Sequence, residues 1–244
     1  MRALFLDCEA GATKELIISS LTSLLDDPKD IERMIADARI PGVTASTEIF
    51  ESSGTVIVRV DIVTEHEEVD GHHHVHRNLA DVISLIDSMN VSSRVKEDAM
   101  AIYELIANAE SQVHKEPVDV VHFHEVGSMG AIASIVGVCM LIERLAPEMI
   151  VSSQMRTGYG KVQCAHGLLP IPAPATAILL DGLPTFAGDE EGEFCTPTGA
   201  AMIKHFTSVH GNRPSMSILR KGYGLGNRKL RTNLSMESVL GETE

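Results

Sequence analysis

The chain has 244 residues, of which 44% are hydrophobic and 22% charged, as is typical of a folded globular protein. Its 34 acidic and 20 basic residues give a formal net charge of -14, so the overall charge does not attract nucleic acid. No apolar run is long enough to span a bilayer, and the N-terminus does not read as a signal peptide. The four cysteines are dispersed and form no C-x-x-C pair, which argues against a disulfide framework. We therefore expect a cytoplasmic protein with no nucleic-acid or membrane partner.

Strand-like and helix-like patterns alternate along the chain. The first half is predicted to contain a strand at 3–6, helices at 16–25 and 28–38, a hairpin within 47–64, and helices at 79–86 and 95–113. The second half is predicted to contain a strand at 118–126, a helix at 132–145, extended chain at 149–162, and helices at 175–180 and from 197 onward.

These elements predict an α/β protein of the mixed α+β kind, with a mixed sheet flanked by helices. Neither an internal repeat nor a flexible linker divides residues 1–236, so we expect one domain there, with or without a small lobe at the hairpin. The tail at 237–244 is polar, and we expect it to fray.

The most informative local pattern is His122-Phe123-His124-Glu125, within the predicted strand. Because side chains alternate along a strand, His122 and His124 would share one face while Phe123 points into the core. Two imidazoles at this spacing can hold one metal ion. Two surface histidines on an edge strand explain the spacing equally well.

Five of the eleven histidines fall within residues 66–76, where His72, His73, His74 and His76 precede a predicted helix. A loop at this place could present several imidazoles to nickel, zinc, copper or iron, and the sequence does not choose among them. A solvated cluster without function is the alternative. An expression tag is disfavoured because the run is internal and Val75 interrupts it.

Three further segments could contribute to a site. His166 precedes the proline-rich stretch 170–174, whose stiffness suits a preorganised group. Thr196, Thr198 and Gly199 lie at the start of a predicted helix, with Thr196 as N-cap and Pro197 as first residue, where free N–H groups favour an anion. An ordinary helix cap explains that pattern as well. Gly222 and Gly224 would let the backbone approach a phosphate.

In this order the segments resemble the LarC family, the nickel insertion proteins of nickel-pincer cofactor biosynthesis. The resemblance covers nearly the full length of the family's N-terminal portion. It is carried by residues 73–74 with 77–82, 121–127, 158–160 with 164–176, 196–201 and 222–226.

The resemblance implies a cyclometallase of the lyase class that inserts nickel into pyridinium-3,5-bisthiocarboxylic acid mononucleotide while CTP is consumed. It implies metal-binding roles for His122 and His124 and for the cluster His72, His73, His74 and His76. Glu125 and His166 become the candidate catalytic groups. Thr196, Thr198, Gly199, Gly222 and Gly224 become candidates for binding the phosphate or cofactor. Zinc or another divalent metal is the alternative to nickel.

The chain departs from the family pattern in three places. The family's N-terminal Ser-Gly-x-x-Gly-Asp-Met is replaced by residues 10–16, Ala-Gly-Ala-Thr-Lys-Glu-Leu. Two aspartates that the family places four residues apart are Gly130 and Ser134 here. The family's CTP-binding C-terminal part has no counterpart, so we expect a separate partner chain to supply it. A homo-oligomer is also compatible with the composition.

These departures leave three functional interpretations. The first is a component of the CTP-dependent nickel insertion enzyme. The second is a metal-binding or substrate-binding paralogue that has lost the insertion chemistry together with the two carboxylates. The third is a different enzyme on the same scaffold, such as a zinc-dependent hydrolase, although no G-x-S-x-G signature is present.

Overall fold

A seven-stranded mixed sheet with the order β11-β4-β1-β13-β12-β3-β2 forms the frame of the structure. The structure is a computed structural model that describes residues 1–52, 55–65, 77–164, 167–227 and 235–244. The strands of this sheet are β1 (Arg2–Leu6), β2 (Val43–Ser52), β3 (Thr55–Thr64), β4 (Met149–Ser152), β11 (Val209–His210), β12 (Ser217–Leu225) and β13 (Ser235–Glu242). Parallel and antiparallel pairs both occur, which confirms the predicted mixed sheet.

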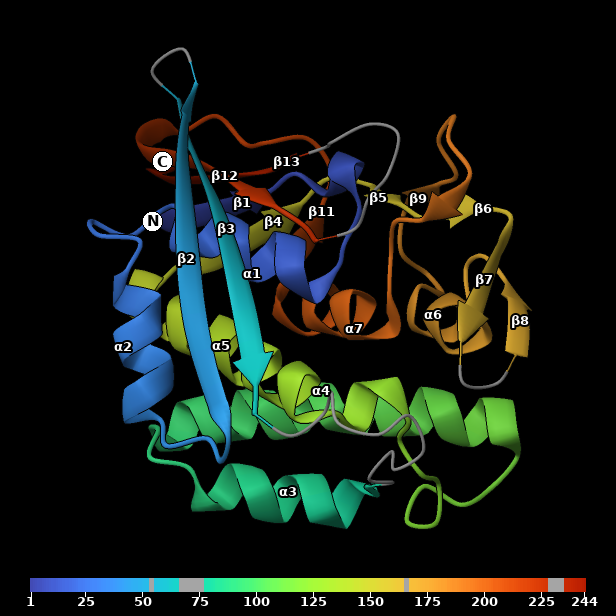
Figure 1. Cartoon of the computed structure of the whole chain (residues 1–244). Coiled ribbons are helices and arrows are strands. Elements are labelled where there is room, and N and C mark those ends of the chain that lie inside the picture. The colour runs from blue at the N-terminus through green and yellow to red at the C-terminus, as the bar shows by residue number, and fades with distance from the viewer. Residues whose placement is uncertain (53–54, 66–76, 165–166, 228–234) are drawn as a thin grey trace.

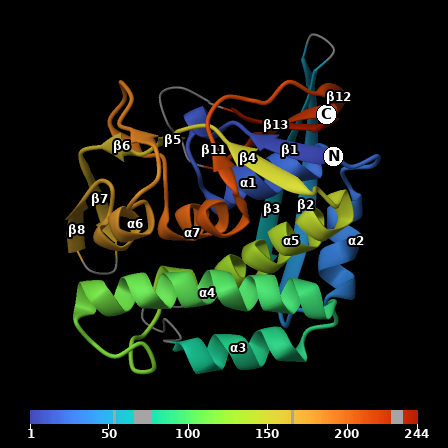
Figure 2. The ribbon, with the colours of Figure 1, turned by 180° about the vertical axis from the view of Figure 1, so that it is seen from behind.

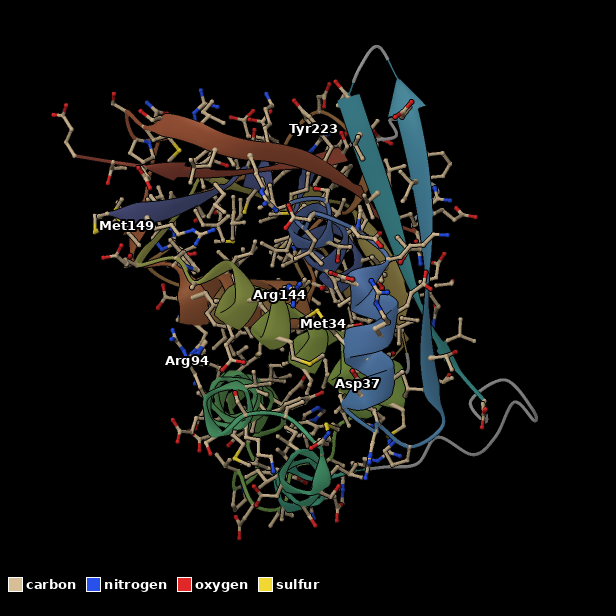
Figure 3. The ribbon with its side chains drawn as sticks, turned by 90° about the vertical axis from the view of Figure 1, so that its left-hand side faces the viewer. Met34, Asp37, Arg94, Arg144, Met149 and Tyr223 are labelled. Carbon is tan, nitrogen blue, oxygen red and sulfur yellow. The ribbon has the colours of Figure 1, made fainter. Side chains whose placement is uncertain are left out.

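Helices lie in layers beneath one face of the sheet (Figure 1). They are α1 (Lys14–Thr22), α2 (Asp30–Asp37), α3 (Leu79–Ser88), α4 (Ser93–His114), α5 (Met129–Leu145), α6 (Pro174–Leu179) and α7 (Pro197–Phe206). Helix α1 contacts β12, β3 and β13, α5 contacts α1, and α4 contacts α5, α6 and α7. From behind, α4 crosses the molecule below these helices, with α3 beneath it (Figure 2). Figure 3 shows the same order, from Tyr223 on the sheet through Arg144 on α5 to Arg94 on α4.

Three short strand pairs extend beside α6, away from the main sheet (Figure 1). They are β5 (Met155–Arg156) with β9 (Thr185–Phe186), β6 (Gly158–Tyr159) with β10 (Gly192–Glu193), and β7 (Lys161–Cys164) with β8 (Gly167–Pro170). Two single-turn 3-10 helices, η1 (Cys8–Ala10) and η2 (Glu125–Gly127), complete the described elements. No described helix has the length and apolar character needed to cross a membrane.

Local chemistry explains where several helices begin. Thr196 is the N-cap of α7, where its hydroxyl accepts the N–H of Gly199, and Pro197 is the first helical residue, as predicted. Thr13 caps α1 in the same way. Asn78 and Asp81 form a capping box at the start of α3.

The predicted strand at 118–126 is wrong. A turn at Pro117 is followed by a single bridge between Phe123 and Arg77, and then by η2. Burial still alternates, because Val121 and Phe123 are buried while His122 is exposed. A strand requires a partner along its length, and this segment pairs at one residue among those described. Alternating burial therefore occurs here without a strand.

The expectation that the tail frays is also wrong. Residues Ser235–Glu242 form β13, which pairs antiparallel with β1 on one side and β12 on the other. Ser238 has no exposed surface, and its hydroxyl donates to that of Ser20 on α1 at 2.9 Å. The segment is stabilised by two neighbouring strands that its own composition does not reveal. Likewise the hairpin β2–β3 forms no separate lobe, since β3 pairs with β12 in the main sheet.

Glycines in β12 allow α1 to approach the sheet closely. A Cβ at Gly224 would lie 2.1 Å from the backbone nitrogen of Ser20, and one at Gly222 would lie 1.9 Å from the Ser23 hydroxyl oxygen. Neither contact is sterically possible. Packing against α1 thus accounts for glycine at both positions.

We predict that Gly224→Ala destabilises the protein by at least about 2 kcal/mol, because the obstructing atom belongs to helix backbone and cannot move alone. This corresponds to a fall in Tm of about 4–8 °C for a chain of this size. Gly130→Ala on α5 is the matched control, since its nearest atom would be Thr64 Cγ2 at 3.9 Å. Differential scanning calorimetry should show no loss of stability for the control. Equal Tm values for the two variants would contradict the packing argument.

Candidate functional site

A pocket of about 300 Å³ lies between the end of α4 and the segment that follows it. Its walls are formed by His114, Glu116, Val121, His122 and His124. Three imidazoles and one carboxylate therefore surround one space. The structure places both His122 and His124 on the wall of this pocket, although no described strand carries them.

The end of α4 turns the chain back toward the pocket. His114 is the last helical residue, and Lys115 has left-handed backbone geometry with a φ of 56°. The N–H of Lys115 donates to the carbonyl of Ser111, which closes the helix. His114 also lies beside Glu110 on its own helix, with 3.6 Å between His114 Nε2 and Glu110 Oε2. His114 and Glu116 thereby face the segment that carries His122 and His124.

Phe123 anchors this segment in the core. Its side chain has no exposed surface, and its ring lies 5.8 Å from that of Tyr103 on α4. Its N–H donates to the carbonyl of Arg77 at 2.7 Å, while the Arg77 guanidinium donates to the carbonyl of Gly127 at 2.6 Å. The neighbouring side chains differ in exposure, with His122 and Glu125 exposed and His124 half-buried. One buried ring thus holds three polar side chains near the surface.

The described residues do not form a complete metal site. No group of three or more His, Cys, Asp or Glu side chains within the described ranges is placed to hold an ion. The pocket offers imidazoles, which suit nickel or zinc, but not the four-ligand set of a closed structural site.

Several predicted site residues lie outside the described residues. These are His72, His73, His74, His76 and His166. The described chain resumes at Arg77, whose backbone pairs with Phe123 between His122 and His124.

The predicted anion-binding residues lie elsewhere. The start of α7 packs on the loop after β1, since Thr196 N–H donates to the Ala12 carbonyl. A Cβ at Gly199 would lie 1.9 Å from the Ala12 oxygen, and Thr198 is buried. Gly222 and Gly224 face α1, as described above. None of these residues lines the histidine pocket, so phosphate binding by them stays a prediction.

Sequence reasoning missed His114, Glu116 and Tyr103. His114 and Glu116 flank a short helix-to-turn connection that ends six residues before His122. A helix end, a proline and a nearby His-x-His pair together could have suggested that the chain folds back. Tyr103 gave no such signal, because it is one of many apolar positions on α4.

The two positions at which the resemblance implies aspartate lie on the first turns of α5. Gly130 is half-buried and open on its Cβ side. Ser134 is 3% exposed, and its hydroxyl donates to the Gly130 carbonyl at 2.7 Å. A Cβ at 130 would make only an ordinary van der Waals contact, whereas an aspartate at 134 would be buried.

Comparison with known proteins places the chain in one family. The family described as nickel insertion protein matches residues 4–241. The pyridinium-3,5-bisthiocarboxylic acid mononucleotide nickel insertion protein of Acetivibrio thermocellus is 34% identical over 249 residues, which cover 100% of this chain and 61% of the relative. The protein of that name from Staphylococcus epidermidis is 37% identical over 227 residues, covering 93% and 56% of the two chains. A putative nickel insertion protein of Geotalea daltonii is 36% identical, covering 100% and 62%. No solved structure matches significantly.

We predict that Phe123→Ala lowers the free energy of unfolding by about 3–5 kcal/mol, because it leaves a cavity in the core. His122→Ala, one residue away, should change it by less than about 0.5 kcal/mol, because His122 is exposed. Urea unfolding followed by circular dichroism measures both values. Similar destabilisation by the two substitutions would show that the segment is not anchored as described.

Proposed function

The chain belongs to the nickel insertion protein family, and we propose that it takes part in inserting nickel into a pyridinium-3,5-bisthiocarboxylic acid mononucleotide. That substrate appears in the names of its relatives. The chain spans 61% and 56% of the length of the first two of them. The observation that carries the proposal is the pocket lined by His114, His122 and His124.

An incomplete ligand set suits an insertion protein. Nickel is here the cargo, and it must leave the protein bonded to two sulfurs and one carbon of the substrate. A closed four-ligand site would retain the ion, as structural zinc sites do. Two imidazoles, from His122 and His124, leave the remaining coordination positions for the substrate.

Formation of the nickel–carbon bond requires a base. The C–H bond of the pyridinium ring breaks, its electron pair forms the bond to nickel, and the proton is transferred. We assign the acceptor role to Glu125, which is exposed next to His124. Nickel stays in the divalent state, so the step requires no redox partner.

The remaining assignments follow from the family. His72, His73, His74 and His76 would recruit nickel, and His166 would act near the metal. Thr196, Thr198, Gly199, Gly222 and Gly224 would bind the phosphate or cofactor. CTP would be bound by a separate chain. The complex of the two chains would be cytoplasmic, and this chain would form homo-oligomers within it. We propose nickel as the ion, with zinc as the competitor that imidazole ligands also accept.

A second function is favoured by Gly130 and Ser134. If the two missing carboxylates are essential, the chain binds metal or substrate without completing insertion. Both functions share the nickel site, and they differ in whether the metal is transferred.

We predict that nickel binding depends on the histidine pair. In an isothermal titration of the purified untagged protein, the double variant His122→Ala/His124→Ala should lose the tightest nickel ion, with affinity falling by at least about 100-fold. The reason is that both proposed ligands are removed from a site with few others.

Two controls accompany this titration. His205→Gln replaces a histidine that pairs with Asp98 at 2.8 Å, outside the pocket, and should retain wild-type nickel affinity. Replacing His72, His73, His74 and His76 by Asn separates ions bound by that cluster from the ion bound in the pocket. Unchanged nickel affinity in the His122/His124 double variant, in this cluster-free background, would refute the proposed site.

Restoring the carboxylates distinguishes the two functions. We expect Gly130→Asp to fold as the wild type does, because the site is open, and Gly130→Asp/Ser134→Asp to be less stable by about 1–3 kcal/mol. Nickel transfer to the mononucleotide is measured with CTP and the remaining part of a full-length relative. Turnover by the unmodified chain supports insertion, whereas turnover that appears only after restoration supports the binding function.

A further inference from the structure

We propose that Tyr103 on α4 is a positioning residue of the nickel site. Its hydroxyl fixes the backbone of the segment that carries His122, His124 and Glu125. The inference rests on the proposed function, because it concerns how the same site is held.

Backbone hydrogen bonds from other described elements reach the segment from 117 to 128 at a few residues. Several of its backbone hydrogen bonds are local, such as that from the N–H of Gly127 to the carbonyl of His124. Local bonds fix the shape of a loop but not its place in the fold. Among the described residues, bonds from outside reach its backbone from Arg77, at Phe123 and Gly127, from Tyr103, at Val126, and from Ile132 on α5, at Ser128.

The contact from Tyr103 is well suited to positioning. The residue has no exposed surface, and its hydroxyl donates to the Val126 carbonyl at 2.9 Å. Burial raises the pKa of Tyr103 well above its usual value, so the hydroxyl keeps its proton at physiological pH. The ring contacts Phe123 with an interplanar angle of 44°. One side chain thus supports the segment on both sides of His124.

Helix α4 links this anchor to the opposite wall of the pocket. Tyr103 and His114 are separated by eleven residues, roughly three helical turns, and therefore lie on the same face of α4. Helix α4 therefore carries both Tyr103, which supports the segment with His122 and His124, and His114, which supplies the third imidazole of the pocket. Loss of the hydroxyl would remove this bond to the Val126 carbonyl and allow the histidine pair to move relative to His114.

The test compares Tyr103→Phe with Tyr223→Phe. Each substitution removes one hydroxyl, and the control loses a 2.9 Å bond to Glu237 on the sheet, on the other side of the helix layers. We expect nickel affinity to fall by about 10-fold in Tyr103→Phe and to be unchanged in Tyr223→Phe. Affinity is measured at a temperature well below the Tm of each variant, in the background that lacks the histidines at 72–74 and 76.

A lower Tm with wild-type nickel affinity would show that Tyr103 has only a structural role, and would overturn the proposal. Amide hydrogen exchange provides a readout that needs no metal. Positioning predicts faster exchange at Phe123, Gly127 and Ser128 in Tyr103→Phe alone. If wild-type nickel binding proves independent of His122 and His124, the proposed function fails. Amide hydrogen exchange alone then decides whether Tyr103 orders the segment. Unchanged exchange in that case would overturn the inference.

Discussion

The close approach of α1 to β12 is the constraint on which the helical layers depend. Because Gly222 and Gly224 place no side chain between β12 and α1, the backbone of α1 packs directly on the sheet. Helix α5 packs on α1, and its Gly137 lies where a Cβ would be 2.8 Å from Ile18 Cδ1. Helix α4 packs on α5 in turn. A succession of tight contacts therefore fixes the distance from the sheet to the helix that carries Tyr103 and His114.

The candidate site uses this rigidity through a segment that is itself irregular. Phe123 is held by burial and by the backbone of Arg77, and its polar neighbours are consequently placed at the surface. A regular strand would have imposed the same alternation of side chains. Its backbone N–H and C=O groups, however, would have been hydrogen-bonded to a neighbouring strand. Here the carbonyls of Val126 and Gly127 instead accept bonds from side chains on other elements. A candidate site built in this way is positioned by a few identifiable contacts, each of which can be removed by substitution.

Local sequence patterns, each extending over no more than about 25 residues, were sufficient to predict much of the fold. The helices α4 and α5, the hairpin β2–β3 and the cap at Thr196 follow from periodicity, turn residues and capping chemistry. The errors occurred where a distant partner decides the outcome. The segment around His122 reads as a strand but pairs at a single residue within the described part of the chain, whereas the segment around Ser238 reads as a tail but has two neighbouring strands. The same reason explains why the sequence pairs His122 with His124 but does not indicate that His114 lines the same pocket.

The central position of β13 bears on how the protein is made. Strand β13 pairs with β1, and in this pairing Arg2 lies opposite Glu242. These two neighbouring strands are therefore far apart in the sequence. During synthesis β1 can pair with β4 early, but its other edge stays unpaired until β13 has left the ribosome. Contacts of such long sequence separation slow folding and leave a strand edge exposed to other chains. Crowded nascent chains of this protein would therefore be vulnerable to aggregation through β1 until the sheet is completed.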